Sequence, residues 1–288
     1  MTLIVGRITQ GGIRVDSDSR ITDRESVANR NDIFTGLLKT VIVNPKISVS
    51  YANGVDTAQI AINEIFKLEE INTKTVNDLL LKIHLDSKQD TDFLIASIEN
   101  ETLLYKICKG KIEISNNVHW IGDVDGFNIY QKNFWPNLKN NDPKHISEVH
   151  SKAFIKAIEA NEAETIGGFH ITIHLTNRGY LEYMEKGISY SGFHKTIKLK
   201  EGFTPLPLGN SQTGAFSECF LKSKNPFKPA IAIHYGIANF GVLFYPRESN
   251  KIIKIDNVNP FEFAKVIKEK YELELTGSVK NGDMITKI

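Results

Sequence analysis

MTLIVGRITQGGIRVDSDSRIT, residues 1–22, is the most informative part of this chain. Leu3 to Thr9 is an apolar-rich and partly alternating run, and Ile13 to Ser19 is a second short run. The glycine pair at positions 11 and 12 lies between the two runs and supplies a turn. Two strand-like runs joined in this way predict a tight β-hairpin at the start of the chain.

Thr2 directly follows the initiator methionine. Removal of Met1, which small second residues such as threonine generally permit, would give an N-terminal threonine with a hydroxyl nucleophile and a free α-amine. With an unperturbed pKa near ~8, this amine can accept the hydroxyl proton directly or through a water molecule. The two arms of the hairpin have similar lengths, so the return strand is expected to bring Asp18 and Arg20 beside the terminus. The alternative is an ordinary soluble domain that begins with a hairpin.

The combination of these residues resembles a known family. The pattern T-x-x-x-G followed by D-S-R-x-T after a glycine turn is similar to the start of proteasome β-subunits and their bacterial relatives. The match needs no gap from Thr2 to Thr22. The resemblance implies that Thr2 is the nucleophile, and that Asp18 and Arg20 belong to the charged cluster around it.

The order of elements predicted along the rest of the chain suits two stacked antiparallel sheets between helical layers. The resemblance implies a specific α+β architecture, the four-layer αββα sandwich of N-terminal-nucleophile (Ntn) hydrolases. We expect this core at residues 1–177 and a C-terminal α/β extension of unknown role at 178–288, which can also continue the same domain. The strand candidates after the hairpin are Lys39–Val43, Ile47–Tyr51, Asp92–Ile98, Thr102–Cys108, Lys111–Ile114, Phe169–Leu175, Thr196–Leu199, Ala230–His234, Gly241–Tyr245 and Lys251–Ile255. The helix candidates are a segment around residues 60–68, then Val76–Leu85 with Thr73 or Thr75 as its cap, Phe127–Trp135, Asp142–Ala160 and Pro260–Lys270.

A lysine at the start of a strand is the third charge that the resemblance implies. Lys39 fits this position, although the loop before it is longer than in typical members; Lys46, in a predicted turn, is the rival. A lysine close to the N-terminal amine disfavours protonation of that amine because like charges repel. A buried lysine needs a paired anion, which gives Asp18 its role. Arg20 can pair with Asp18 or with an incoming carboxyl group, or it can form a plain surface ion pair.

The remaining parts of the implied site are less regular. A tetrahedral oxyanion needs backbone N–H donors, and by resemblance the donor is the amide of Ala52, where most relatives have glycine. Relatives also carry Gly-Ser-Gly after a strand, and here Asp123 takes the serine position. A carboxylate there would anchor an ammonium group and raise its pKa. The family pattern Asp-x-x-Ser-Gly-Gly has become AETIGG at residues 163–168, with Ile166 in place of the serine.

The composition excludes several other classes of function. The chain has 288 residues, 41% of them hydrophobic and 24% charged, which is ordinary for a globular protein. With 35 basic and 34 acidic residues, no charge excess points to nucleic acid or to an anionic membrane. No stretch reaches the ~18 apolar residues of a membrane span, and the start lacks a signal-peptide pattern, so we expect a cytoplasmic protein.

The cysteines and histidines indicate neither a disulfide framework nor a metal site. Cys108 and Cys219 fit a reducing compartment, with a single bridge between them as the alternative. His170 and His174 point to one strand face but lie too far apart to share a metal. All eight histidines are expected to be structural or exposed.

We therefore expect a threonine-type peptidase or amide hydrolase that forms an acyl-enzyme on Oγ1 of Thr2 without a metal or organic cofactor. By resemblance, the substrate is a peptide or an unfolded protein, and the chain assembles with copies of itself into a ring, barrel or spiral. The sequence does not identify an unfoldase partner. Two alternatives stay open: a non-proteolytic amidase of the same superfamily, and a catalytically silent assembly subunit, which the departures at Asp123 and Ile166 favour.

Overall fold

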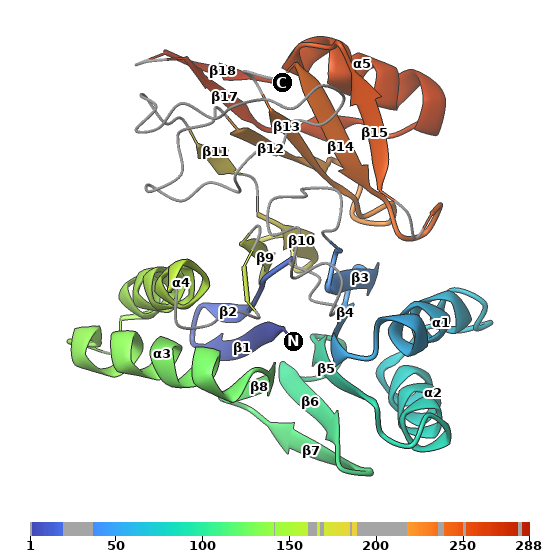
Figure 1. Ribbon diagram of the computed structural model, residues 1–288, viewed down its shortest axis with the longest axis vertical. Coiled ribbons are helices and arrows are strands. Elements are labelled where there is room, and N and C mark those ends of the chain that lie inside the picture. Colours follow the sequence, from blue (N-terminus) through green and yellow to red (C-terminus); the bar gives the residue numbers. More distant parts are fainter. Residues whose placement is uncertain are drawn as a thin grey trace, which may run out of the picture. The chain divides into compact units, whose positions relative to one another are not determined.

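The computed structural model describes residues 2–19, 37–140, 142–160, 166–167, 170–184, 186–188, 218–235, 239–249, 252–281 and 284–288 (Figure 1). Within these residues the chain is a mixed α+β protein with several antiparallel sheets and five α-helices. It divides into two compact units. The first unit runs to Leu181, and the described part of the second begins at Glu182. No helix in the described residues is long and apolar enough to cross a membrane.

The first sheet is built on the predicted hairpin and has the order β10-β9-β2-β1-β8. Its strands are β1 (Leu3–Thr9), β2 (Gly12–Ser17), β8 (Val118–Gly122), β9 (Ile171–Leu175) and β10 (Leu181–Tyr183). The hairpin register runs from Ile4 opposite Ser17 to Thr9 opposite Gly12. The turn therefore lies at positions 10 and 11, and Gly12 belongs to the second strand. The φ of Gly12 is +120°, a value that L side chains rarely adopt, which explains the glycine.

The second sheet has the order β3-β4-β5-β6-β7 with antiparallel neighbours throughout. Its strands are β3 (Thr40–Asn44), β4 (Ile47–Asn53), β5 (Thr91–Ser97), β6 (Leu103–Cys108) and β7 (Lys111–Ser115). Two helices, α1 (Val55–Ile65) and α2 (Thr73–Asp86), connect β4 to β5. The predicted cap of α2 was wrong: Asn72 is the N-cap, and Thr75 completes a capping box at the third helical position. The side chain of Asn72 accepts from the Thr75 amide while the Thr75 hydroxyl accepts from the Asn72 amide, so both donors are satisfied.

The two sheets pack against each other through β1. A Cβ added at Gly6 would lie 2.8 Å from Cδ2 of Leu104 and 3.3 Å from Cδ2 of Leu94, so glycine allows the close approach. The opposite face of β1 contributes Leu3 and Val5 to an apolar core with α3 (Val124–Phe134) and α4 (Pro143–Glu159). Pro136 ends α3 as predicted, within the 3₁₀ turn Trp135–Asn137.

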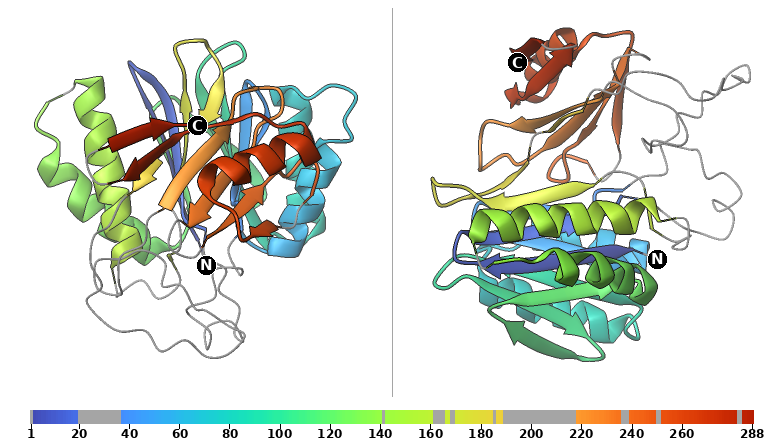
Figure 2. Two further views of the ribbon diagram at one scale, coloured as in Figure 1. Left: turned by 90° about the horizontal axis from the view of Figure 1, so that it is seen from above. Right: turned by 90° about the vertical axis from the view of Figure 1, so that its left-hand side faces the viewer.

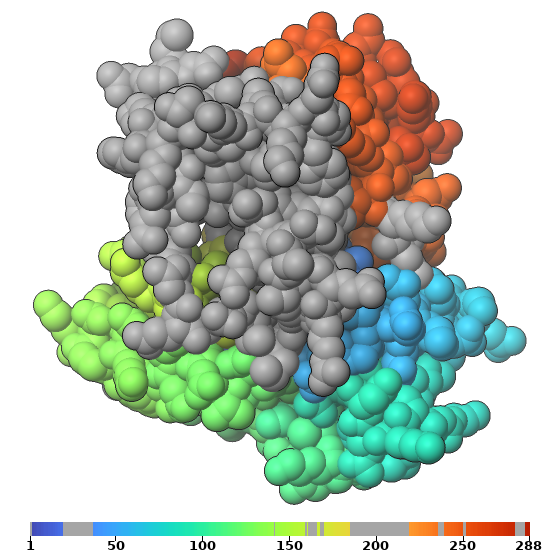
Figure 3. All heavy atoms as spheres, in the orientation of Figure 1, coloured from blue at the N-terminus to red at the C-terminus, as the bar shows by residue number. Residues whose placement is uncertain are grey.

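The two helix pairs of the first unit cover different sheets. Figure 2 shows α3 and α4 side by side over the β1–β2 hairpin, whereas α1 and α2 lie against the strands of the second sheet. In the space-filling view of Figure 3, the green and blue-to-cyan surfaces are those of the two helix pairs and neighbouring strands. Burial of the four helix faces against the sheets follows from the apolar stripes of these helices.

The second unit contains a sheet of its own, with the order β11-β12-β13-β14-β15 and β16 paired to β12. The strands are β11 (Lys186–Ile188), β12 (Glu218–Ser223), β13 (Ile231–Tyr235), β14 (Phe240–Phe244), β15 (Ile253–Asp256) and β16 (Leu275–Thr276), followed by the hairpin β17 (Ser278–Asn281) and β18 (Met284–Lys287). Helix α5 (Pro260–Tyr271) buries Phe263 and Ile267 against this sheet. The strand predicted at Thr196–Leu199 lies outside the described residues.

Candidate functional site

Thr2 lies at the start of β1 with its main chain held by the end of β8. The amide of Asp123 donates to the carbonyl oxygen of Thr2 at 2.6 Å. A Cβ on Gly122, whose φ is +100°, would lie only 1.8 Å from that oxygen. Position 122 therefore has to be glycine for β8 to approach the first residues of the chain this closely. Thr2 is 5% exposed.

Asp18 and Lys39 form a buried ion pair next to Thr2. Nζ of Lys39 lies 3.1 Å from Oδ1 and 3.0 Å from Oδ2 of Asp18, and the two residues are 2% and 0% exposed. Asp18 also accepts from the amide of Leu3 at 3.1 Å and from the amide of Gly167 at 3.3 Å. The carboxylate is therefore bonded to the residue that immediately follows Thr2.

Burial and hydrogen bonding act in opposite directions on Asp18. Burial raises the pKa of this carboxyl, while the Lys39 ammonium and the amides of Leu3 and Gly167 oppose the rise. A lysine with so little exposure is stable in its charged form only because a carboxylate shares its environment. The pair thus places one positive and one negative charge at the N-terminal end of β1, in the arrangement expected from the sequence.

Lys39, and not Lys46, occupies this position. Lys39 immediately precedes β3, and its carbonyl accepts from the amide of Tyr51 on β4. Lys46 lies in the turn between β3 and β4, where its Nζ donates to the carbonyl of Gly179 at 2.8 Å. The rival lysine therefore takes no part in the Asp18 ion pair.

Ala52 and Asp123 also border Thr2. Ala52 is fully buried on β4. A Cβ built on Gly122 would lie 1.8 Å from the Thr2 carbonyl oxygen and 3.5 Å from Cβ of Ala52, so all three residues are close together. Asp123 is the N-cap of α3, and its Oδ1 accepts from the amide of Gly126 at 2.8 Å. Capping is a role that the sequence analysis did not assign to it. Arg20 lies outside the described residues.

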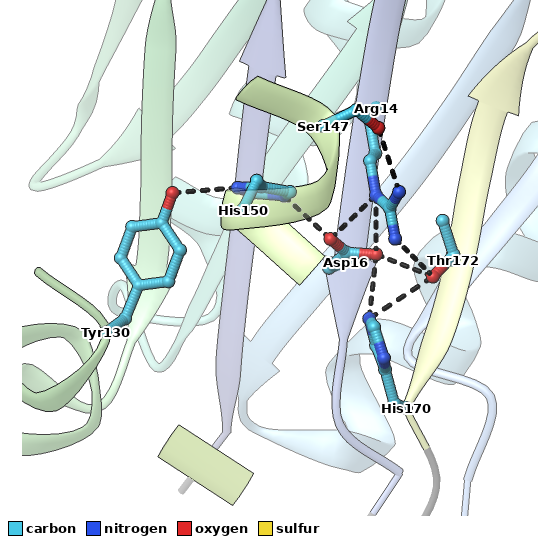
Figure 4. A network of polar contacts seen from close by, with 7 residues as sticks. All are labelled: Arg14, Asp16, Tyr130, Ser147, His150, His170 and Thr172. Carbon is cyan, nitrogen blue, oxygen red and sulfur yellow. Dashed lines mark hydrogen bonds and ion pairs between the residues drawn. The ribbon is translucent and has the colours of Figure 1, made fainter. Parts of the chain in front are cut away.

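A second buried polar cluster, which the sequence analysis missed, lies where β2 and β9 meet α3 and α4 (Figure 4). Its centre is Asp16, a fully buried carboxylate on β2. Nε of Arg14 lies 2.9 Å and 3.2 Å from its two oxygens, and the Thr172 hydroxyl donates to Oδ1 at 2.6 Å. The Asp16 cluster comprises Arg14, Asp16, Tyr130, Ser147, His150, His170 and Thr172.

Two histidines complete the Asp16 cluster. Nε2 of His150 lies 2.7 Å from Oδ2 of Asp16, and Nε2 of His170 lies 2.8 Å from Oδ1. The second ring nitrogen of His150, Nδ1, lies 2.7 Å from the hydroxyl of Tyr130. Arg14 also donates to the hydroxyl of Ser147 at 3.1 Å, which ties β2 to α4.

The protonation of this cluster follows from its environment. The Arg14 guanidinium, with the histidines, holds the pKa of Asp16 well below its usual range even though burial acts to raise it. Burial lowers the pKa of His150, and burial raises the pKa of Tyr130 to about 12. The two ring nitrogens of His150 thus face different groups, Nε2 the Asp16 carboxylate and Nδ1 the Tyr130 hydroxyl, and a neutral ring carries its proton on one of them.

One signal in the sequence could have indicated this cluster. Arg14, Asp16 and Asp18 alternate with apolar or small residues in a strand that is buried on both faces. Charged side chains at every second position of such a strand require partners from another element. The spacing of the histidines along the sequence, which bears on metal binding, does not reveal those partners. The two histidines of the cluster are buried beside Asp16.

The cysteines form no disulfide within the part of the chain that the structure describes. Cys108 and Cys219 are both reduced, so no bridge joins them. Within the described residues, no three His, Cys, Asp or Glu side chains come together in a way that could hold a metal ion.

No protein-family model matches the chain, and a search of curated proteins finds no significant match. An interpretation of the site therefore depends on its residues and their geometry.

Proposed function

We propose that this chain is an Ntn amide hydrolase related to proteasome β-subunits, with Thr2 as its nucleophile after removal of Met1. The observation that carries the proposal is the buried ion pair of Lys39 with Asp18, whose carboxylate also binds the amide of Leu3. The resemblance implies both residues, Asp18 through the D-S-R-x-T pattern and Lys39 through its position at the start of a strand. The two sheets contact each other at Gly6. Helices α1 and α2 cover one sheet, and α3 and α4 cover the other, which supports a four-layer αββα sandwich.

The proposed reaction is hydrolysis of an amide through an ester on Thr2. The free α-amine takes the hydroxyl proton as Oγ1 attacks the carbonyl carbon, which gives a tetrahedral oxyanion. By resemblance, the amide of Ala52 donates to this oxyanion. Collapse of the intermediate breaks the C–N bond, the leaving amine takes the proton, and water then hydrolyses the ester to regenerate Thr2.

Lys39 and Asp18 have an electrostatic part in this scheme. A positive charge near the α-amine disfavours its protonation and keeps it available as a base. Asp18 keeps that charge in place, because a lone ammonium in so buried a position would lose its proton instead. Until Met1 is removed, the nitrogen of Thr2 is an amide and cannot accept a proton.

The resemblance extends the proposal to substrate and assembly. A peptide or an unfolded protein is the proposed substrate, and a ring, barrel or spiral of identical chains is the proposed assembly. An unfoldase would supply an unfolded substrate to such an assembly, and we name no particular partner. We further propose that the protein acts in the cytoplasm.

One observation favours the catalytically silent alternative. Ile166 takes the position where relatives have a serine, and it is buried against α3: a Cβ on Gly126 would lie 1.9 Å from its Cδ1. An apolar side chain cannot relay a proton, and the carboxylate of Asp123 is engaged in capping α3. The small-amide amidase differs from the peptidase only in substrate size.

The test combines intact mass with an active-site probe. We expect the purified protein to lack Met1, and a β-lactone or epoxyketone probe to add one label to Thr2. Thr2→Ser should retain labelling because it keeps a hydroxyl and an α-amine, and Thr2→Ala should abolish it. Loss of Met1 without any labelling would support the silent subunit. Labelling that persists in Thr2→Ala would eliminate the proposed nucleophile.

A further inference from the structure

Two buried carboxylates stand two residues apart at the end of β2, and each has its own cation. Asp18 is paired with Lys39, while Asp16 is paired with Arg14. Arg14 is 12% exposed and is also held by the hydroxyls of Ser147 and Thr172. These extra hydrogen bonds fix the guanidinium on Asp16, so the Asp16 charge is compensated without drawing Lys39 away from Asp18.

The same two carboxylates hold both ends of one short segment. At one end, the amide of Gly167 donates to Oδ2 of Asp18 at 3.3 Å, and the amide of Ser19 donates to the carbonyl of Gly167 at 3.2 Å. At the other end, Nε2 of His170 lies 2.8 Å from Oδ1 of Asp16. Gly167 and His170, three positions apart in the sequence, are therefore each bonded to a carboxylate at the end of β2, close to Thr2.

The His170 contact is built to be rigid. The ring of His170 stacks on the ring of Phe154 from α4, with 5.0 Å between centroids, and its side chain is 9% exposed. The Thr172 hydroxyl lies 3.2 Å from Nε2 of His170 and donates to the same Asp16 oxygen. Stacking sets the plane of the ring while the carboxylate sets its direction, so few alternative rotamers remain.

The geometry points to Asp16 and His170 as positioning residues for the Thr2 site. By holding the segment at His170, they keep the amide of Gly167 on Asp18, and Asp18 in turn keeps its orientation toward Lys39 and the amide of Leu3. Neither residue touches the nucleophile or the reacting atoms. This inference rests on the proposed function for its catalytic consequence, but the clamp itself is a property of the fold and can be measured without activity.

The matched variants are His170→Phe and His170→Gln. Phenylalanine keeps the stack on Phe154 and loses the N–H group that faces Asp16, whereas glutamine offers an N–H group near the Nε2 position. Two quantities are measured in each protein: the second-order rate of probe labelling at Thr2, and the hydrogen-exchange rate of the Gly167 amide by NMR.

We expect His170→Phe to slow labelling and to speed exchange at Gly167 by about tenfold or more each, the effect of losing one hydrogen bond to a charged group. His170→Gln should restore both rates to near their original values. A purely stabilising role predicts that the rates of both variants follow their unfolding midpoints instead. Equal rates in the two variants, or unchanged Gly167 exchange in His170→Phe, would overturn the inference.

Failure of the proposed function gives a different result. If the unaltered protein is not labelled at Thr2, the hydrolase proposal fails and with it the catalytic role of the clamp. The exchange rate of Gly167 then still decides whether Asp16 and His170 hold the segment. Tenfold faster exchange in His170→Phe with rescue by His170→Gln supports the clamp, and its absence refutes it.

Discussion

Substitution of Lys39 by methionine is the most direct test of the buried ion pair. Methionine has a similar length and keeps most of the apolar contacts of the lysine stem, but it removes the ammonium that lies 3.0 Å from Asp18. Asp18 would keep the amides of Leu3 and Gly167 as donors but would lose its cation. Breaking a buried pair by removing one partner destabilises proteins by about 3–5 kcal/mol.

The loss should depend on pH because Asp18 can be protonated in the variant. Burial already raises the pKa of Asp18, and removal of the Lys39 charge raises it further. A carboxyl whose folded pKa exceeds the unfolded value near ~3.9 binds its proton more tightly in the folded state. Stability from this protonation is present below the unfolded pKa and is lost as pH rises through the folded pKa. The Lys39→Met penalty is therefore largest at neutral pH and shrinks by up to about 1.4 kcal/mol for each pH unit below it.

Urea unfolding followed by tryptophan fluorescence measures this penalty. Both tryptophans, Trp120 and Trp135, belong to the first unit, so the signal reports on the unit that contains the pair. Lys46→Met is the matched control, because the Lys46 ammonium bonds a carbonyl group and lies over the Tyr180 ring without a carboxylate partner among the described residues, and its loss should cost about 1 kcal/mol at every pH. Equal losses in Lys39→Met and Lys46→Met, or a Lys39→Met penalty that is flat from about pH 5 to 7, would refute the reasoning.

Three further measurements test the surroundings of the site. Gly122→Ala should destabilise the protein by more than about 2 kcal/mol in urea unfolding, because the added Cβ collides with a carbonyl oxygen. Gly179→Ala, where φ is positive but the added Cβ would lie at an ordinary contact distance of 3.8 Å from Nζ of Lys46, should cost about 1 kcal/mol. Stability should fall between about pH 6.5 and 5, because burial lowers the pKa of His150 in the folded protein. The stability that the neutral His150 contributes is complete above the unfolded pKa and is lost as pH falls below it, so His150→Gln should flatten this part of the profile. Tyr130→Phe should cost about 1–3 kcal/mol at pH 7.5, measured by the same unfolding assay, since it leaves Nδ1 of His150 buried without its hydroxyl partner. No change in Tyr130→Phe would mean that this hydrogen bond does not contribute to stability.

Local signals predicted much of the first unit. The hairpin at residues 3–17, the strand pair around Pro45 and the helix that begins at Pro143 all carry turn or cap residues that act within a few positions in sequence. Where prediction erred, a local competition decided the outcome. Asn72, and not Thr73 or Thr75, is the N-cap of α2, because its side chain accepts from the Thr75 amide while the Thr75 hydroxyl accepts from the Asn72 amide.

The pairing of Lys39 with Asp18 could be predicted, although the two residues are 21 positions apart, only because a family pattern supplied the spacing. Nothing in the local sequence distinguishes Lys39 from Lys46 except the turn that holds the latter. The capping role of Asp123 shows the opposite case: a family position suggested one function, and the start of a helix at Val124 gave the side chain another partner. A resemblance can indicate which position matters, but the hydrogen bonds at that position depend on the side chain present: Asp123 accepts from the amide of Gly126.

The Asp16 cluster could not be predicted from short-range patterns, because its members lie between 2 and more than 150 residues apart in the sequence. A strand places alternate residues on one face, so Arg14 and Asp16 had to meet either solvent or another element. Which of these applies depends on whether α4 covers the strand, and that is a property of the tertiary structure. Once α4 covers it, the energetic penalty of a buried charge requires polar partners for both residues: Thr172 donates to Asp16, and Ser147 on α4 accepts from Arg14. The charged residues of β2 therefore constrain the helix and the strand that pack on them.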